Sequence, residues 1–188
     1  PLADGMRVLD ACAAPGGKTA HMLERHALRL TAIDSDAQRL ARIGQNLDRL
    51  GLSGPQAMLR HADAADPAAW WDGQAFDAIL ADVPCTASGV VRRHPDIRWL
   101  RRPEDLPRTA ALQARIADAL WPLLRTGGHL LYATCSIFPL ECEDQVRAFL
   151  GRHPDARRLP APGQILPLPG ANGETGDGFF YALIAKHE

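Results

Sequence analysis

The chain has 188 residues, of which 46% are hydrophobic, so it is long enough for one well-buried α/β domain and short for two. Its formal net charge of −1 excludes a uniformly basic surface, so any contact with nucleic acid must depend on a local cluster of basic residues. No apolar run approaches the roughly 18 residues that span a membrane, and no signal peptide opens the sequence, so we expect a cytoplasmic protein without a membrane partner. The four cysteines lack the spacing of metal ligands, and we therefore expect free thiols and no bound metal.

Residues 7–19 form the first predicted unit, in which a short apolar strand ends at Asp10 and a helix follows over residues 20–26. Glycines let a backbone approach a ligand closely, and a helix N-terminus presents free N–H groups. A phosphate-binding P-loop needs glycine where Cys12 stands, and a G-x-G-x-x-G dinucleotide fingerprint is absent. We therefore predict a cofactor without phosphate groups, such as S-adenosylmethionine (SAM), with an ordinary strand–helix turn as the alternative. The residues of this predicted cofactor loop are Cys12, Ala13, Ala14, Pro15, Gly16, Gly17 and Lys18.

Each of the next three predicted strands leads to an acidic residue. A strand over residues 28–33 ends at Asp34, 17 residues after Gly17, close to the spacing at which such sheets bind ribose hydroxyls. A helix follows over residues 37–50, where leucine and isoleucine recur at helical spacing. A weaker strand over residues 56–60 precedes Asp63, which we predict to contact an adenine amino group, with a surface-loop position almost equally favoured. A fourth strand over residues 76–81 ends at Asp82, shortly before Cys85.

The second half of the chain opens with a long irregular segment over residues 86–107. Segments of this length are usually functional or disordered, and basic residues with an aromatic residue suit a nucleic-acid strand. A helix is predicted over residues 106–124, and a fifth strand over residues 129–133 leads to Cys135. Another helix over residues 140–150, a surface excursion over residues 154–176 with one short strand, and a closing strand over residues 178–186 complete the chain. The predicted RNA-binding residues are Arg92, Arg93, Arg98 and Trp99.

These alternating elements predict one α/β domain over residues 1–188, with a doubly wound, Rossmann-like, mainly parallel sheet and an antiparallel C-terminal strand. In such a sheet ligands bind at the carboxyl ends of the strands. A single cysteine at this edge would be interpreted as structural, as Cys142 is. A pair of cysteines beside a cofactor loop instead predicts thiolate nucleophile chemistry. The polar residues expected at this edge are Asp10, Asp34, Asp82, Cys85 and Cys135.

Three motifs carry a family resemblance: Asp10-Ala-Cys-Ala-Ala-Pro-Gly-Gly-Lys-Thr19, Asp82-Val-Pro-Cys85 and Ala133-Thr-Cys-Ser136. Together they resemble the SAM-dependent RNA cytosine-5 methyltransferases, the family of the Sun proteins. Residues 88–99 and 176–181 are similar to the bacterial members that act on small-subunit ribosomal RNA, and the resemblance runs from residue 6 to residue 186. Members of this type carry N-terminal RNA-binding regions. We expect this chain to lack that region and to bind RNA weakly on its own.

The resemblance implies methyl transfer from SAM to carbon 5 of a cytosine in small-subunit (16S) ribosomal RNA, by a monomeric enzyme. It implies that Cys135 attacks carbon 6 of the base and that Cys85 assists removal of the carbon-5 proton or release of the enzyme. Asp82 is implied to hydrogen-bond the cytosine edge at nitrogen 3. The loop over residues 12–18 is implied to contact SAM, together with Asp34, Asp63 and, in part, Asp82.

The same residues are compatible with three other functions. A DNA cytosine-5 methyltransferase uses the cysteine of the Pro-Cys motif as its nucleophile, which would be Cys85 and would leave Cys135 without a role. A cytosine-5 methyltransferase acting on another RNA, such as tRNA, would use the same machinery. A non-catalytic SAM-fold protein that binds RNA during ribosome assembly would need neither cysteine.

Overall fold

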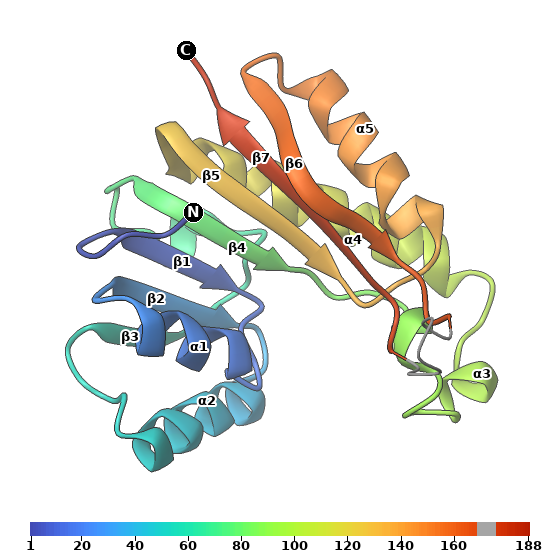
Figure 1. Ribbon diagram of the computed structural model, residues 1–188, viewed down its shortest axis with the longest axis horizontal. Helices are drawn as coiled ribbons and strands as arrows, with labels where there is room; N and C mark the ends of the chain where they lie inside the picture. The colour runs from blue at the N-terminus through green and yellow to red at the C-terminus, as the bar shows by residue number, and fades with distance from the viewer. Residues whose placement is uncertain (169–175) are drawn as a thin grey trace.

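A seven-stranded sheet forms the centre of the chain, in the order β3-β2-β1-β4-β5-β7-β6. It is seen in a computed structural model that describes residues 1–168 and 176–188 (Figure 1). Strands β1 to β5 pair in parallel, whereas β7 runs antiparallel to both of its neighbours. This confirms the predicted α/β class and the mainly parallel, Rossmann-like sheet with an antiparallel C-terminal strand. The strands are β1 (Arg7–Ala11), β2 (Arg29–Asp34), β3 (Ala57–His61), β4 (Phe76–Asp82), β5 (Leu124–Thr134), β6 (Ala156–Ile165) and β7 (Phe179–Lys186).

Helices cover both faces of this sheet, so each face has its own apolar core. Successive strand residues point to opposite faces, and β1 shows the consequence. Val8 packs with Ile43 of the α1 and α2 side, whereas its neighbour Leu9 packs with Ile116 of the α4 and α5 side. Figure 1 shows the α1 and α2 pair and the α4 and α5 pair on opposite sides of the sheet. The helices are α1 (Gly17–Arg25), α2 (Ala37–Leu50), α3 (Ile97–Leu100), α4 (Asp105–Leu120) and α5 (Glu143–Arg152).

The predicted boundary between α4 and β5 was wrong. The helix ends at Leu120 instead of continuing to residue 124, and a 3-10 turn containing Pro122 follows. Strand β5 begins at Leu124 and includes Gly127 and Gly128, which lie between the predicted helix over residues 106–124 and the predicted strand over residues 129–133. A side chain on Gly128 would place its Cβ only 2.8 Å from the Asp77 carbonyl oxygen, so this residue must be glycine for β5 to approach β4. The pair of glycines therefore forms an irregularity inside the strand, where the register with β4 shifts.

Three further segments also differ from their prediction. The expected surface excursion over residues 154–176 contains a ten-residue edge strand, β6, which tolerates its prolines because its register with β7 shifts between Leu159 and Gly163. Residues 169–175 of that excursion lie outside the described residues. Helix α5 begins at Glu143, after a 3-10 turn over Pro139–Glu141, instead of at residue 140. The irregular segment over residues 86–107 contains the short helix α3.

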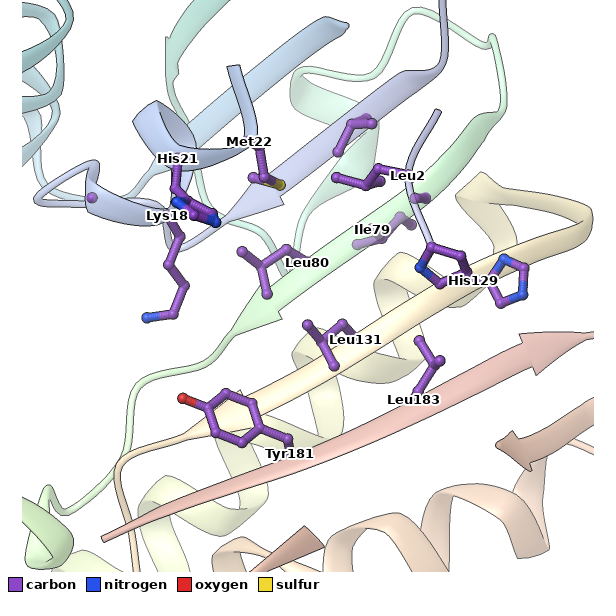
Figure 2. Close-up of a pocket in the computed structure, with 14 residues that line it drawn as sticks. Leu2, Lys18, His21, Met22, Ile79, Leu80, His129, Leu131, Tyr181 and Leu183 are labelled. Carbon is purple, nitrogen blue, oxygen red and sulfur yellow. The ribbon is translucent and has the colours of Figure 1, made fainter. Parts of the chain in front are cut away.

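An apolar groove lies on the sheet beside α1 and encloses about 330 Å³. Figure 2 shows Met22, Leu80, Leu131 and Leu183 lining it, with Lys18 and Tyr181 at one end. None of the helices in residues 1–168 and 176–188 is long and apolar enough to cross a membrane. The groove is apolar along the sheet and ends beside the charged side chain of Lys18.

The two-faced core predicts a large cost for truncating a side chain in the central strands. Leu130 of β5 is fully buried, and we expect Leu130→Ala to lower the free energy of unfolding by about 2–5 kcal/mol. Leu100→Ala is the matched control, because that leucine is 66% exposed and its truncation should change stability by no more than about 0.5 kcal/mol. Urea unfolding followed by circular dichroism measures both. Equal losses in the two variants would contradict the placement of this core.

Candidate active site

The predicted cofactor loop between β1 and α1 is held from two neighbouring elements. The Ala14 backbone N–H donates to Asp34 Oδ2 at the end of β2, at 3.1 Å. From α2, the Arg39 guanidinium donates to the Ala14 carbonyl oxygen at 3.0 Å. Gly16 has a φ of +96°, and a Cβ there would lie 2.9 Å from Ile43 of α2, so only glycine fits at this turn. The loop is therefore rigid and lies close against α2.

The Lys18 and Thr19 side chains of the Gly-Lys-Thr sequence bind other side chains of the protein. Lys18 Nζ forms an ion pair with Asp82 Oδ2 at 2.6 Å, and Thr19 Oγ1 donates to Asp10 Oδ2 at 2.6 Å. Burial lowers the pKa of Lys18, but the ion pair with Asp82 outweighs this effect and holds it above its ordinary value. Both side chains that a P-loop directs to phosphate and metal thus bind carboxylates from strand ends.

Asp10 is the most enclosed of these carboxylates. It is fully buried, and burial raises its pKa to about 7 despite the hydrogen bond from Thr19. Its Oδ1 atom has no hydrogen-bond partner among the described residues. A buried polar atom without a partner is costly for the charged form, which agrees with the raised pKa of this carboxyl group.

Two adjoining cavities lie along the carboxyl ends of the strands. The larger encloses about 370 Å³ and brings together predicted residues from the ends of β1, β2, β4 and β5, namely Cys12, Asp34, Asp82, Cys85 and Cys135. The smaller encloses about 150 Å³, shares Cys12 and Asp34 with the larger one, and is closed by Asp63. Every strand-end residue predicted from the sequence except Asp10 therefore lines one continuous depression.

The two cysteines predicted to act together are in contact. Cys85 Sγ and Cys135 Sγ lie 3.3 Å apart, although 50 residues separate them in the chain. The hydrogen bond from Cys85 lowers the pKa of Cys135. The same contact, together with burial, raises the pKa of Cys85. A thiolate on Cys135 accepting a hydrogen bond from a thiol on Cys85 is therefore the favoured state of the pair.

A buried glutamate that the sequence analysis did not select connects the loops that carry these cysteines. Glu141 is fully buried and accepts hydrogen bonds from Thr86, which follows Cys85, and from Ser136, which follows Cys135. The sequence analysis placed Glu141 inside the helix predicted over residues 140–150 and gave it no role. Its contacts come from loops that are distant in sequence, so no local pattern indicates them.

The predicted RNA-binding arginines are divided into two groups by the fold. Arg93 Nε lies 2.5 Å from Asp177 Oδ2, and Arg92 reaches the same carboxylate at 3.8 Å, so their charge is partly neutralised. Arg98 forms no ion pair with a described residue, and Trp99 is 87% exposed. Of the four predicted RNA-binding residues, Arg98 therefore keeps a charge that no described carboxylate neutralises, and Trp99 has an exposed ring.

Cys142 lies in the apolar core and burial raises its pKa to about 11, in keeping with the structural role predicted for it. Within the described residues, no three His, Cys, Asp or Glu side chains are grouped so that they could hold a metal ion. The two cavities are lined by three thiols, three carboxylates and the guanidinium group of Arg39, and Lys18 is paired with one of these carboxylates.

The family model described as "16S rRNA methyltransferase RsmB/F" matches residues 2–185. "Ribosomal RNA small subunit methyltransferase B" of Vibrio vulnificus is 53% identical over 188 residues, which cover 97% of this chain and 43% of that protein. The protein of the same name from Xanthomonas campestris is 53% identical and is matched over 98% of this chain and 44% of its own length. The chain thus spans less than half the length of these curated relatives.

Solved structures agree with the sequence relatives. "The crystal structure of NSun6 from Pyrococcus horikoshii with SFG" superposes with a TM-score of 0.81 and 30% identity, over all of this chain and 49% of that one. A methyltransferase homologue from the same organism superposes with a TM-score of 0.75 and 31% identity, over 98% of this chain and 62% of that one. The resemblance carried by the three sequence motifs is confirmed: this chain belongs to the RsmB/F family of 16S rRNA methyltransferases.

Proposed function

We propose that this chain is the catalytic part of a SAM-dependent ribosomal RNA methyltransferase that modifies carbon 5 of a cytosine through a covalent bond to Cys135. The observation that carries the proposal is the 3.3 Å contact between Cys135 and Cys85 at the edge of a cavity that Asp34 and Asp82 also line. The names of the curated relatives support small-subunit ribosomal RNA as the substrate.

The residues of the two cavities fit SAM. The carboxylates of Asp34 and Asp82 line the larger cavity, and their negative charge suits a ligand with positive sulfonium and ammonium groups. The loop over residues 12–18 would hold the amino-acid tail, Asp34 the ribose hydroxyls and Asp63 the adenine amino group. When bound, SAM supplies an electrophilic methyl group.

Cys135 solves the chemical difficulty of the reaction. Carbon 5 of cytosine is a poor nucleophile, but a thiolate that adds to carbon 6 turns the ring into an enamine-like species. The Cys135 sulfur–carbon 6 bond forms first, and carbon 5 then takes the methyl group as the bond between that methyl group and the cofactor sulfur breaks. Water takes the carbon-5 proton, and the sulfur–carbon 6 bond breaks as the double bond returns and Cys135 regains its thiolate. Nitrogen 3 would take a proton from solvent as negative charge develops on the ring, and Asp82, held by Lys18, would accept the hydrogen bond from this protonated edge.

Cys85 supports the release step as well as the attack. Its thiol donates to the Cys135 sulfur, and this hydrogen bond stabilises the thiolate both before addition and when the sulfur leaves carbon 6. Without it, Cys135 is a poorer leaving group and the adduct persists. The two cysteines are therefore proposed to fail in different ways when each is removed.

Arg98 and Trp99 are the proposed contacts for the RNA strand around the target base. The exposed indole offers a surface on which a base can stack, and the guanidinium can bind phosphate. Arg92 and Arg93 are proposed to act mainly by anchoring this segment to Asp177.

The SAM assignment predicts a loss of affinity when Asp34 is changed. Asp34→Ala removes the proposed ribose acceptor and should weaken SAM binding by about 1–3 kcal/mol, or about fivefold to 150-fold, measured by isothermal titration calorimetry. Asp36→Ala is the matched control, because Asp36 bonds only the start of α2 and lines neither cavity. Unchanged affinity in a folded Asp34→Ala variant would refute the assignment.

The covalent mechanism predicts opposite outcomes for the two cysteines. With SAM and unmodified ribosomal RNA, Cys135→Ala should give neither methylated product nor adduct, because the attacking thiolate is missing. Cys85→Ala should accumulate RNA bound to Cys135, because release is impaired, and this species migrates slowly on a denaturing gel. The double variant should show no such band.

Peptide mass spectrometry of the trapped species locates the bond, and mapping of tritium from labelled SAM in the wild-type reaction identifies the modified base. Attachment at Cys85 would indicate the DNA-type mechanism and overturn the proposal. Binding of SAM and RNA without any turnover would favour the non-catalytic assembly factor, and methylation of tRNA in place of ribosomal RNA would overturn the substrate class.

A further inference from the structure

We propose that Glu141 is a positioning residue that ties the two cysteine loops together and fixes which thiol carries the proton. The assignment rests on the proposed function only for its effect on turnover, because the state of the two thiols can be measured without any methyl transfer. Glu141 lies in the 3-10 turn between β5 and α5 and lines neither cavity of the site. It touches the reacting groups only through its neighbours.

The contacts of Glu141 join the residues that directly follow the two cysteines. Its Oε1 atom accepts from the Thr86 backbone N–H at 2.8 Å, and its Oε2 atom accepts from the Thr86 hydroxyl at 2.5 Å. The same Oε2 atom accepts from the Ser136 hydroxyl at 2.6 Å. One side chain therefore sets the distance between the loop after β4 and the loop after β5, and with it the 3.3 Å contact of the two sulfurs.

A second layer of bonds fixes the glutamate in turn. Gln113 of α4 donates from Nε2 to the Pro84 carbonyl oxygen at 2.8 Å and lies 3.4 Å from Glu141 Oε1. The Tyr132 hydroxyl lies 2.9 Å from the Glu141 carbonyl oxygen and 3.1 Å from Gln113 Oε1. Residues on both sides of Cys85 are thus bound to one buried network that includes helix α4 and strand β5.

The chemistry of this network requires a carboxylate. Each group that reaches the Glu141 side chain is a donor: one backbone N–H, two hydroxyls and one amide. A glutamine would place its NH2 group where Oε2 now accepts from the Thr86 and Ser136 hydroxyls, so both hydroxyls would have to turn and accept instead. No described lysine or arginine forms an ion pair with Glu141, so its charge is balanced by hydrogen bonds alone and acts on the nearby thiols.

The charges around the thiols are asymmetric. The contact with Cys135, burial and the charge of Glu141 raise the pKa of Cys85. On the other side, Cys135 faces the ion pair of Asp82 and Lys18, and Arg101 from the segment before α4 donates to the Thr86 carbonyl oxygen. The contact with Cys135 and burial are the larger effects, and Glu141 adds to them against a thiolate on Cys85, so we place the proton on Cys85 and the reacting thiolate on Cys135.

Alkylation of the thiols tests this directly. The full chain is treated with iodoacetamide over about pH 6 to 9, a range that spans the ordinary pKa of cysteine near 8.5, and peptide mass spectrometry gives the rate at each cysteine. We expect Cys135 to react faster than Cys85 in the wild type. In Glu141→Gln this preference should fall about tenfold, the change expected for one unit of relative thiol pKa. The kcat for methyl transfer should fall by a similar factor, with the KM for SAM within about twofold.

Glu143→Gln is the matched control, because it removes an equal charge two residues away from an exposed side chain that pairs with Arg158. This control should change neither the alkylation preference of Cys135 over Cys85 nor the kcat for methyl transfer. An unchanged alkylation preference in a folded Glu141→Gln variant would overturn the proposal. If wild-type protein shows no turnover, the proposed function fails, and the alkylation ratio still decides the role of Glu141.

If Glu141→Gln does not fold, two milder variants test the same contacts. Thr86→Val and Ser136→Ala each remove one hydroxyl donor and keep the carboxylate charge. Each should lower kcat about threefold to tenfold with the KM for SAM unchanged, because a hydrogen bond to a charged group is lost and the cysteine loops separate. Full kcat in both folded variants would show that the tie is not needed and would overturn the proposal.

Discussion

The site depends on the strand order around β1, because the strands that follow it in the chain are placed on both of its sides. Strand β2 pairs on one side of β1 and β4 pairs on the other, so the loops that leave their carboxyl ends turn away from each other. The gap between them is where an open parallel sheet can admit a ligand. The same geometry brings Asp34, Asp82 and Cys135 to one edge, although they lie far apart in the sequence.

Negative charge is concentrated at this edge, and the protein controls it in three ways. Asp82 is paired with Lys18, Asp10 is buried with its pKa raised to about 7, and Asp34 is bound by the backbone N–H groups of Ala14 and Asp36. Repulsion between the carboxylates is thereby reduced, yet the cavity keeps a field that suits a cationic ligand. Lys18 also marks the end of the apolar groove beside α1, so the charged and apolar surfaces meet at this residue.

The sequence predicted those parts of the fold that local chemistry determines. Helix α2 has the predicted bounds because Asp36 caps its start and Gly51, with a φ of +69°, ends it. The end of α4 was missed because the 3-10 turn through Pro122 continues the apolar pattern of the helix. Strand β6 was missed because its prolines and glycine are typical of loops and are tolerated only at a sheet edge. The strand-end residues could be placed from their spacing, whereas the partners of Arg93 and the contacts of Glu141 depend on loops that only the folded chain brings together.

The two thiols show why spacing alone could not assign their roles. Cys85 and Cys135 are chemically identical, and each follows a parallel strand that ends at the same cavity. Their contact allows the proton to sit on either sulfur, so the choice depends on the charges behind them. Lys18 favours a thiolate on Cys135, its partner Asp82 opposes one, and Glu141 opposes one on Cys85. A buried carboxylate that pairs with no described lysine or arginine costs stability, and we propose that this one is kept because it holds the two cysteine loops together. The direction of proton sharing between two identical groups therefore depends on the charges behind them as well as on their own contact.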